Sequence, residues 1–482
     1  MVAEVKPSYK FVLEIIMKSS WYTPQQETLI RNWQNLQFGM FIHFGLYSLA
    51  GGCWNGKPVK RGYCEQIAAH GDIPPADYEA LTRRFTAQNF DAEAIARLAK
   101  EAGMRYIVLT SKHHDGFCLF NTDTTDYNSA KAACARDLIA ETAAACKKEG
   151  LALGLYFSLI DWHCPWAAPV SDHNSDPIPP KHHAYNLSQL TELLTHYGDI
   201  CELWLDMGHP TREQSEQMYT LVHSLQKNIM INGRIWNDRG DFATMPDNAL
   251  PELPYPDYTL NIPWQTPASI YKETWGYKSW QERGSAKEKI TELTASLRSV
   301  SARGGNYLLN IGPDGTGAVI PFEAEVLRGI GKNLQREPLP CTANRQIPKP
   351  SVSDCAIGAL PAASTNLFRY TGEDYYSLRP IVTGKRWHIE FGRNSAATEQ
   401  PYTLRWKTAH PLKEAVKLCF EDDYRRICFS LKKGASTGII DSSYRLSENG
   451  GFAVLELSTV GSPLERPELP FSDIELLLEQ SV

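Results

Sequence analysis

Short apolar runs alternate with amphipathic segments over roughly the first 310 residues of the chain. The run 38–45 (FGMFIHFG) is apolar almost throughout, which predicts a buried strand. The segment 91–102 repeats its apolar residues at helical spacing and ends before Gly103, which predicts a helix. The same patterns predict further strands over 106–110, 151–158, 200–206, 228–232 and 306–311, and further helices over 137–148, 187–197, 212–226 and 286–300.

Strands that alternate with helices of this length are typical of parallel β/α units. Six strands lie before residue 312, and the proline-rich stretch 245–280 has room for one or two more. This count predicts an α/β fold of the (β/α)8-like TIM barrel type. An open doubly wound sheet is the alternative, but no G-x-G-x-x-G follows a strand, so its usual dinucleotide signature is missing.

The pattern changes after the proline-containing stretch 338–350. The segments that follow are short, β-rich and separated by Gly, Asn, Ser and Pro, which predicts an antiparallel β-sandwich. We therefore expect two domains, a barrel over 1–337 and a C-terminal β-sandwich over 345–482. The predicted strands of the second domain cover 387–391, 403–407, 415–420, 426–431 and 452–457.

Composition narrows the class of protein. The 49 basic and 55 acidic residues give a net charge of -6, which argues against binding to nucleic acid or to an anionic membrane. The 11 cysteines form no C-x-x-C pair and argue against a secreted disulfide scaffold. The apolar stretch 11–17 contains Glu14 and is too short for a secretory leader or a membrane span. A cytoplasmic location is the default expectation, and secretion or periplasmic export after removal of a leader stays open.

Polar residues gather at the carboxyl ends of the predicted strands. In a TIM barrel the loops after these ends form the active site. A single polar residue there is usually a cap or part of a turn, but five consecutive strand ends carry one. The residues in question are His43, His113 with His114, Tyr156, Asp206 and Arg234.

Several kinds of site can be set aside. His113 and His114 are adjacent, neighbours on a strand point to opposite faces, and no H-x-H or H-E-x-x-H is present, so no metal site is predicted. The G-x-S-x-G of a serine nucleophile is absent, and the glycines at 304–317 lack the lysine of a phosphate loop. What remains is Asp206, which could attack an anomeric carbon. A buried carboxylate that caps a helix is an equal alternative.

At these residues the sequence resembles glycoside hydrolase family 29, the α-L-fucosidases. The resemblance implies a barrel with a C-terminal β-sandwich, retention of configuration, no metal or organic cofactor, and a fucosylated oligosaccharide or glycoconjugate as substrate. It leaves linkage preference and homo-oligomerisation open. The matching stretches occur in order at 38–45 (FGMFIHFG), 106–117 (YIVLTSKHHDGF), 154–158 (GLYFS), 202–208 (ELWLDMG), 231–234 (INGR), 275–277 (WGY) and 303–312 (RGGNYLLNIG).

The resemblance also implies a role for each matching residue. Asp206 corresponds to the family's nucleophile, and Arg234 to a residue close to it. Trp275 corresponds to the aromatic residue that faces the C5 methyl group of the sugar. The residues that correspond to hydroxyl-binding positions are His43, His113, His114 and Tyr156.

Two further matches are weaker. Glu65 resembles a subsite glutamate that is usually followed by Trp, whereas Gln66 follows it in this chain. Trp54 could supply an aromatic wall close to that glutamate, and core packing explains it equally well. Both residues are kept as predicted substrate-binding residues.

Position 265 departs from the family pattern. The general acid/base there is commonly a Glu after Trp, whereas this chain has Trp264-Gln265-Thr266. An amide cannot donate the proton that a leaving group needs, and the loss of acid/base help typically costs about 10²- to 10⁴-fold. The explanations are an engineered replacement of glutamate by glutamine, a natural divergence, or a different acid such as Glu273, Glu65 or Asp161.

The resulting hypothesis is a retaining α-L-fucosidase that works through a covalent fucosyl-Asp206 intermediate and is impaired by Gln265 at the acid/base position. A catalytically inactive fucose-binding protein on the same scaffold is the alternative. A barrel glycosidase that acts on another sugar is a third hypothesis.

Overall fold

The structure is a computed structural model of the whole chain. It describes residues 24–341 apart from 166–176, 237–239, 246 and 249–262, and beyond them the strands and some connecting residues between 364 and 480.

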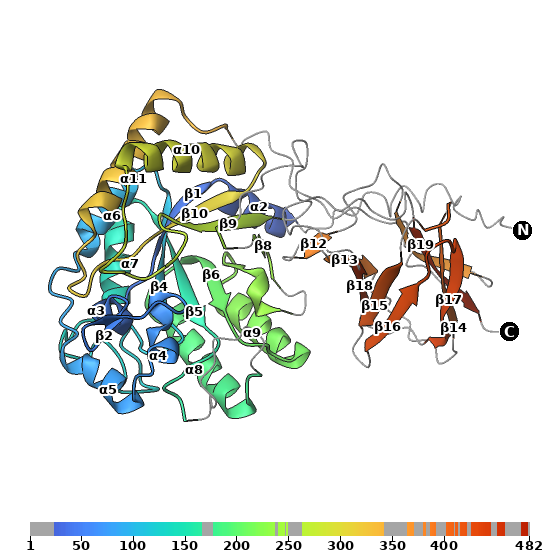
Figure 1. Cartoon of the computed structure of the whole chain (residues 1–482), viewed down its shortest axis with the longest axis horizontal. Helices are drawn as coiled ribbons and strands as arrows, with labels where there is room; N and C mark the ends of the chain where they lie inside the picture. Colours follow the sequence, from blue (N-terminus) through green and yellow to red (C-terminus); the bar gives the residue numbers. More distant parts are fainter. Residues whose placement is uncertain are drawn as a thin grey trace, which may run out of the picture.

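Eight parallel strands form one curled sheet in the N-terminal part of the chain (Figure 1). Their order along the sheet is β7-β6-β5-β4-β1-β10-β9-β8, and a parallel bridge between Asn232 and Phe242 joins the two ends. Neighbours in the sheet thus follow the order of the chain, which confirms the TIM-like barrel and excludes the doubly wound alternative. The strands are β1 (Phe38–Ile42), β4 (Tyr106–Lys112), β5 (Ala152–Ser158), β6 (Ile200–Asp206), β7 (Met230–Ile231), β8 (Ala243–Thr244), β9 (Trp264–Ser269) and β10 (Asn306–Ile311).

Helices lie around this sheet (Figure 1). Asp91 and Asp137 cap their helices by accepting a hydrogen bond from the backbone of the first turn, which supplies a partner for an otherwise unpaired N–H. Gly150 ends the second of these helices in the left-handed conformation. The longer helices are α2 (Pro24–Gln34), α6 (Ala92–Glu101), α7 (Leu138–Glu149), α8 (Pro180–His196), α9 (Arg212–Leu225), α10 (Ala286–Ala302) and α11 (Pro321–Arg336).

Shorter elements fill the loops after the strands. A two-stranded hairpin and several single turns follow β1, and one 3-10 turn follows β7. These elements are α3 (Leu46–Ala50), β2 (Cys53–Trp54), β3 (Lys57–Pro58), η1 (Cys64–Gln66), α4 (Ile67–His70), α5 (Pro75–Glu79), η2 (Ala80–Arg83) and η3 (Gly233–Ile235).

The predicted elements of the barrel are confirmed in kind, with changes at their ends. The predicted strand 228–232 is reduced to the two residues of β7. The stretch 245–280 holds β9, whereas β8 precedes it. The sequence does not predict β8, because its two residues are too few to show any periodicity.

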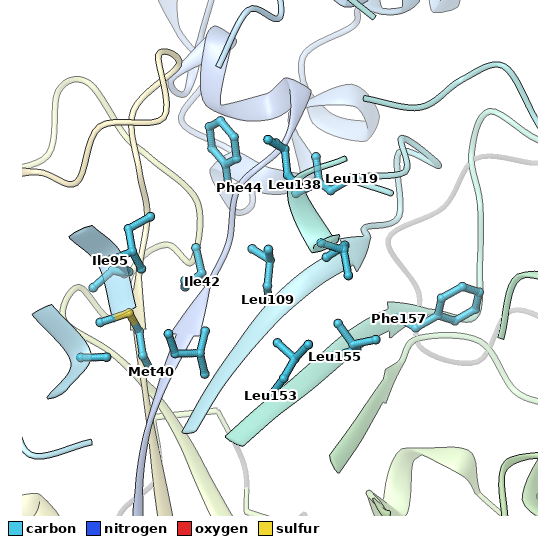
Figure 2. Packing of buried hydrophobic residues seen from close by; sticks show 14 of the residues in the cluster. Met40, Ile42, Phe44, Ile95, Leu109, Leu119, Leu138, Leu153, Leu155 and Phe157 are labelled. Carbon is cyan, nitrogen blue, oxygen red and sulfur yellow. The ribbon is translucent and has the colours of Figure 1, made fainter. Parts of the chain in front are cut away.

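Side chains alternate between two layers along each barrel strand. Figure 2 shows Met40 and Ile42 of β1 beside Leu109 of β4, in the layer between the sheet and its helices. Phe41, between the first two, belongs to a second cluster inside the barrel together with Tyr156. Because the side-chain period of a strand is two, the pattern that packs one set of residues under the helices directs the other set toward the barrel axis.

The C-terminal strands form two antiparallel sheets, with orders β11-β19-β14-β17 and β12-β13-β18-β15-β16. The five strands predicted from sequence fall at β13, β14, β15, β16 and β18. Packing of the two sheets as a sandwich stays a prediction, and so do the domain boundaries. The strands are β11 (Ser364–Tyr370), β12 (Arg379–Ile381), β13 (Arg386–Phe391), β14 (Tyr402–Lys407), β15 (Val416–Glu421), β16 (Arg426–Leu431), β17 (Thr437–Tyr444), β18 (Gly451–Leu457) and β19 (Ile474–Gln480).

Within the described ranges, no helix combines the length and the apolar character that crossing a membrane requires.

The layer between sheet and helices should dominate the stability of the barrel. We expect Leu155→Ala to lower the free energy of unfolding by about 2–5 kcal/mol, because Leu155 is fully buried in that layer and its loss leaves a cavity. Leu225→Ala is the matched control, since Leu225 is 36% exposed and should change stability by no more than about 0.5 kcal/mol. Guanidinium unfolding followed by circular dichroism measures both, and equal effects would contradict the layer assignment.

Candidate active site

A pocket opens at the carboxyl ends of the barrel strands. Eight of the ten residues predicted from sequence line it, and Gln265 and Trp54 do not. The described residues that line it are Phe41, His43, Tyr63, Glu65, Gln66, His113, His114, Tyr156, Trp204, Asp206, Met207, Arg234, Asp247 and Trp275.

Asp206 is the last residue of β6 and is held from both sides. The Tyr156 hydroxyl donates a hydrogen bond of 2.8 Å to its Oδ2, and Arg234 Nη1 lies 2.5 Å from its Oδ1. Burial alone would raise the pKa of this carboxyl, but the charge of Arg234 and these hydrogen bonds outweigh burial and lower it. Asp206 is therefore an ionised carboxylate at neutral pH, as a nucleophile must be.

The backbone turns sharply directly after Asp206. Met207 has a φ of 58° and Gly208 a φ of 74°, both in the left-handed region. A non-glycine residue with this conformation costs free energy, and such residues concentrate at functional sites. The turn brings Met207 itself into the lining of the pocket.

Arg234, in η3, joins two carboxylates. Its Nη1 pairs with Asp206, and its Nη2 lies 2.6 Å from Asp247 Oδ1. The guanidinium also lies over the Trp204 ring, 4.6 Å from the centroid. Asp247 was missed by sequence reasoning because it follows β8, the strand that had no recognisable pattern.

The three pocket histidines are neutral at ordinary pH. Burial lowers the pKa of His43 to about 3 and that of His114 to about 4, and it holds the pKa of His113 well below its usual value. His113 stacks on Tyr156 with ring centroids 5.3 Å apart. Neutral imidazoles beside aromatic rings suit recognition of sugar hydroxyls.

The prediction that His113 and His114 point to opposite faces is wrong. Both line the pocket, with ring centroids 4.0 Å apart. The reason is that β4 ends at Lys112, so the alternation of a strand no longer governs the two residues after it. No group of three or more His, Cys, Asp or Glu side chains suited to a metal ion is found in the described part of the chain.

Glu65 lies in η1 and holds the loop that carries Trp275. Its Oε2 accepts hydrogen bonds from the backbone N–H groups of Gly276, at 2.7 Å, and Trp275, at 3.2 Å. Burial raises the pKa of Glu65 to about 7, although these hydrogen bonds oppose the shift. Glu65 is thus a pocket carboxyl that titrates near neutral pH.

Gln265, predicted at the acid/base position, is not among the described residues that line the pocket. Gln265 is the second residue of β9 and pairs in register with Asn306, the first residue of β10, so it lies near the amino ends of the strands. Its Oε1 accepts from the Trp204 indole at 2.8 Å, and Trp204 precedes Asp206 by one inward-facing position along β6. Trp204 therefore separates Gln265 from the carboxylate.

Gln265 belongs instead to a buried network at the floor of the barrel. Its Nε2 donates to both oxygens of Glu202, at 2.9 and 3.0 Å, and to the Tyr106 hydroxyl. Burial raises the pKa of Glu202 to about 7. Gly154 and Gly39 leave the space for this network, because a Cβ there would lie 2.9 Å from the Glu202 side chain and 2.3 Å from the Tyr106 ring.

The remaining candidates lie away from the pocket lining. Trp54 is in β2 and packs against the core cluster. Asp161 is buried, and its Oδ1 accepts backbone hydrogen bonds from His163 and Cys164. Glu273 is exposed. None of the three is among the described residues that line the pocket.

The site combines a strand-end carboxylate, a second carboxylate across one guanidinium, neutral imidazoles and an aromatic wall on a TIM-like barrel, which are the features of a glycoside hydrolase. A family model described as alpha-L-fucosidase matches residues 14–337. The tissue alpha-L-fucosidase of Bos taurus is 28% identical over 335 residues, which cover 65% of this chain and 70% of the relative. The chain belongs to the α-L-fucosidase family, glycoside hydrolase family 29.

Solved structures agree with this assignment. Alpha-L-fucosidase AlfC from Lactobacillus casei, in complex with alpha-L-fucose product, is 32% identical with a TM-score of 0.56, and the match covers 64% of this chain and 98% of that chain. Alpha-L-fucosidase isoenzyme 1 from Paenibacillus thiaminolyticus is 25% identical with a TM-score of 0.56, and the match covers 95% of this chain and 100% of that chain.

The position of Gln265 can be tested by Gln265→Glu. We expect no gain in activity and a loss of about 1–3 kcal/mol in unfolding free energy, because a second carboxyl would face Glu202 and could not donate to both of its oxygens. The loss should grow as the pH rises past about 7, where Glu202 also ionises. Thermal unfolding at pH 6 and pH 8 measures this loss of stability, and Gln265→Met serves as an uncharged control variant. A large rise in activity would restore Gln265 as the acid/base position.

Proposed function

We propose that this chain is a retaining α-L-fucosidase that removes terminal α-L-fucosyl residues from fucosylated oligosaccharides or glycoconjugates, with Asp206 as its nucleophile. The observation that carries the proposal is the ionised Asp206 at the end of β6, oriented by Tyr156 and Arg234 in the pocket. A carboxylate that is already oriented and ionised loses little conformational entropy on the way to the transition state.

In the first step, an Asp206 oxygen forms a bond to C1 of the fucosyl residue while the bond from C1 to the leaving oxygen breaks, and that oxygen takes a proton from the acid. In the second step, the residue that served as the acid acts as a base and takes a proton from water, whose oxygen displaces Asp206 from C1. Arg234 and the Tyr156 hydroxyl stabilise the carboxylate that is released.

We assign the acid/base role to Asp247. Retaining glycosidases place their two carboxyl groups about 5–5.5 Å apart. Asp206 and Asp247 contact the two terminal nitrogens of one guanidinium, an arrangement compatible with that spacing. The Asp247 side chain is 32% exposed, so it can meet both the leaving group and the incoming water. The earlier hypothesis of a catalyst impaired by Gln265 is dropped, because that amide lies at the barrel floor.

Glu65 is the second candidate for the acid. Its pKa of about 7 favours proton donation near neutral pH. Against this role stands its burial, with one oxygen already occupied by two backbone N–H groups. We propose that Glu65 orders the Trp275 loop and binds the sugar.

The rest of the pocket suits a deoxy sugar. We propose that His43, His113 and His114 bind hydroxyl groups. Phe41 and Trp275, whose ring centroids lie 6.0 Å apart, would provide an apolar surface for the C5 methyl group. Outside the pocket, we retain the C-terminal β-sandwich as a proposal, supported by the relative from Paenibacillus thiaminolyticus that matches 95% of the chain.

Asp206→Ala tests the nucleophile. Activity on an aryl α-L-fucoside should fall by roughly 10⁴-fold or more, because removal of a covalent nucleophile typically has an effect of this order. A mechanism-based 2-fluoro fucosyl fluoride should label the peptide that contains Asp206, as read by mass spectrometry. Full activity of the variant, or a label on another residue, would refute the assignment. Absence of any aglycone release by the unmodified protein would favour the fucose-binding alternative.

Asp247→Asn and Glu65→Gln form a matched pair of tests for the acid. We expect Asp247→Asn to slow hydrolysis of a fucosyl oligosaccharide by about 10²- to 10⁴-fold, and to affect the first step with an activated aryl fucoside far less. Azide should rescue this variant and yield the α-fucosyl azide, since the covalent intermediate still forms. If Glu65→Gln shows this pattern and Asp247→Asn does not, Glu65 is the acid.

A further inference from the structure

Asn310 connects two parts of the pocket from behind. It lies on β10, its side chain is buried, and it contacts His43 on one side and the backbone of Trp275 on the other. Its Nδ2 donates a hydrogen bond of 2.7 Å to the Trp275 carbonyl. Its Oδ1 lies 2.7 Å from His43 Nδ1.

These two contacts determine which nitrogen of His43 carries the proton. A backbone carbonyl can only accept, so the amide nitrogen of Asn310 must face Trp275 and the amide oxygen must face His43. The amide oxygen can only accept as well, so His43 Nδ1 must carry a hydrogen. Because burial keeps the ring neutral, with a pKa of about 3, His43 Nε2 is unprotonated and acts as an acceptor.

Ser158 has the same effect on His114 by a different route. The Ser158 hydroxyl donates its one hydrogen to the Ile160 carbonyl at 2.7 Å. Its oxygen, 2.7 Å from His114 Nδ1, must then accept from that nitrogen. His114 Nε2 is thus also unprotonated, and it lies 3.7 Å from Asp206 Oδ2.

His113 differs from its two neighbours. Its Nδ1 is buried and has no hydrogen-bond partner among the described residues. A hydrogen-bond partner at Nδ1 therefore fixes the tautomer of two of the three pocket histidines. His113 lacks such a partner among the described residues and serves as the comparison.

We propose that Asn310 and Ser158 are positioning residues that hold His43 and His114 in the Nδ1-protonated tautomer, so that the pocket offers two Nε2 acceptors and selects glycosides with donating hydroxyls at these two places. The identity of the sugar in this proposal rests on the proposed function, whereas the tautomers do not. A group that cannot donate, such as a hydrogen, a fluorine or a methyl ether at the same carbon, leaves a buried acceptor unpaired and should be bound more weakly.

The tautomers can be measured in the free protein. With histidine labelled by ¹⁵N, chemical shifts distinguish protonated from unprotonated ring nitrogens, and His43→Gln and His114→Gln assign the signals. We expect both rings to show a protonated Nδ1 and an unprotonated Nε2 near pH 7. A protonated Nε2 on either ring would overturn the proposal, and this result does not depend on whether the protein hydrolyses fucosides.

The effect on selectivity needs paired variants and paired substrates. Asn310→Ala and Ser158→Ala should each lower kcat/KM on an aryl α-L-fucoside by about 10- to 100-fold. On one monodeoxy fucoside, the Asn310→Ala variant should lose almost no kcat/KM. His43→Gln should have no effect on the same analogue. Likewise, Ser158→Ala and His114→Gln should both leave kcat/KM almost unchanged on one and the same monodeoxy fucoside.

Ser111→Ala is the matched control. Ser111 is a buried serine on β4 whose hydroxyl donates to the Tyr156 carbonyl at 2.6 Å, so the change removes an equivalent hydroxyl without touching a histidine partner. Its effect should be uniform across the deoxy series. Equally uniform losses for Asn310→Ala and Ser158→Ala would mean a structural role only and would overturn the proposal. If the unmodified protein cleaves no fucoside, the proposed function fails while the ¹⁵N result still decides the tautomers.

Discussion

The pocket depends on the ion pair between Asp206 and Arg234. A buried carboxylate without a partner would take up a proton or destabilise the fold, because desolvation of a charge costs several kcal/mol. The two side chains are only 12% and 24% exposed, so water screens their attraction weakly. Arg234 keeps Asp206 ionised, and the same guanidinium fixes Asp247 on its other nitrogen.

The position of Arg234 depends in turn on the barrel below it. The guanidinium lies over Trp204, and the Trp204 indole is held by Gln265. Gln265 is anchored by Glu202, which also accepts a hydrogen bond of 2.6 Å from the Trp33 indole. A continuous series of hydrogen bonds and ring contacts thus runs from α2 and the amino ends of the strands to the Asp206 carboxylate. Such fully paired buried networks favour one arrangement of side chains over its alternatives.

Sequence reasoning located pocket-lining residues where a residue follows directly from a strong strand pattern. His43, Tyr156 and Asp206 fall at or next to the carboxyl ends of β1, β5 and β6, and the periodicity of those strands was readable. Asp247 follows a strand of two residues, for which no periodicity exists. The tautomers of His43 and His114 depend on Asn310 and Ser158 in other strands, contacts that a local pattern does not contain.

The sequence could not show that Gln265 lies outside the pocket, and there is a specific physical reason for this. The motif indicated where Gln265 lies in the chain, but its height in the barrel depends on the register of β9 against β10, which pairs it with Asn306 at the amino end. At that height the side chain must accept one hydrogen bond, from the Trp204 indole, and donate to a carboxylate, Glu202. An ionised glutamate has no hydrogen to donate, and a protonated one has a single hydrogen for two acceptor oxygens and the Tyr106 hydroxyl. An amide of this length accepts from the indole and has two hydrogens to donate, so glutamine at 265 fits the chemistry of the barrel floor.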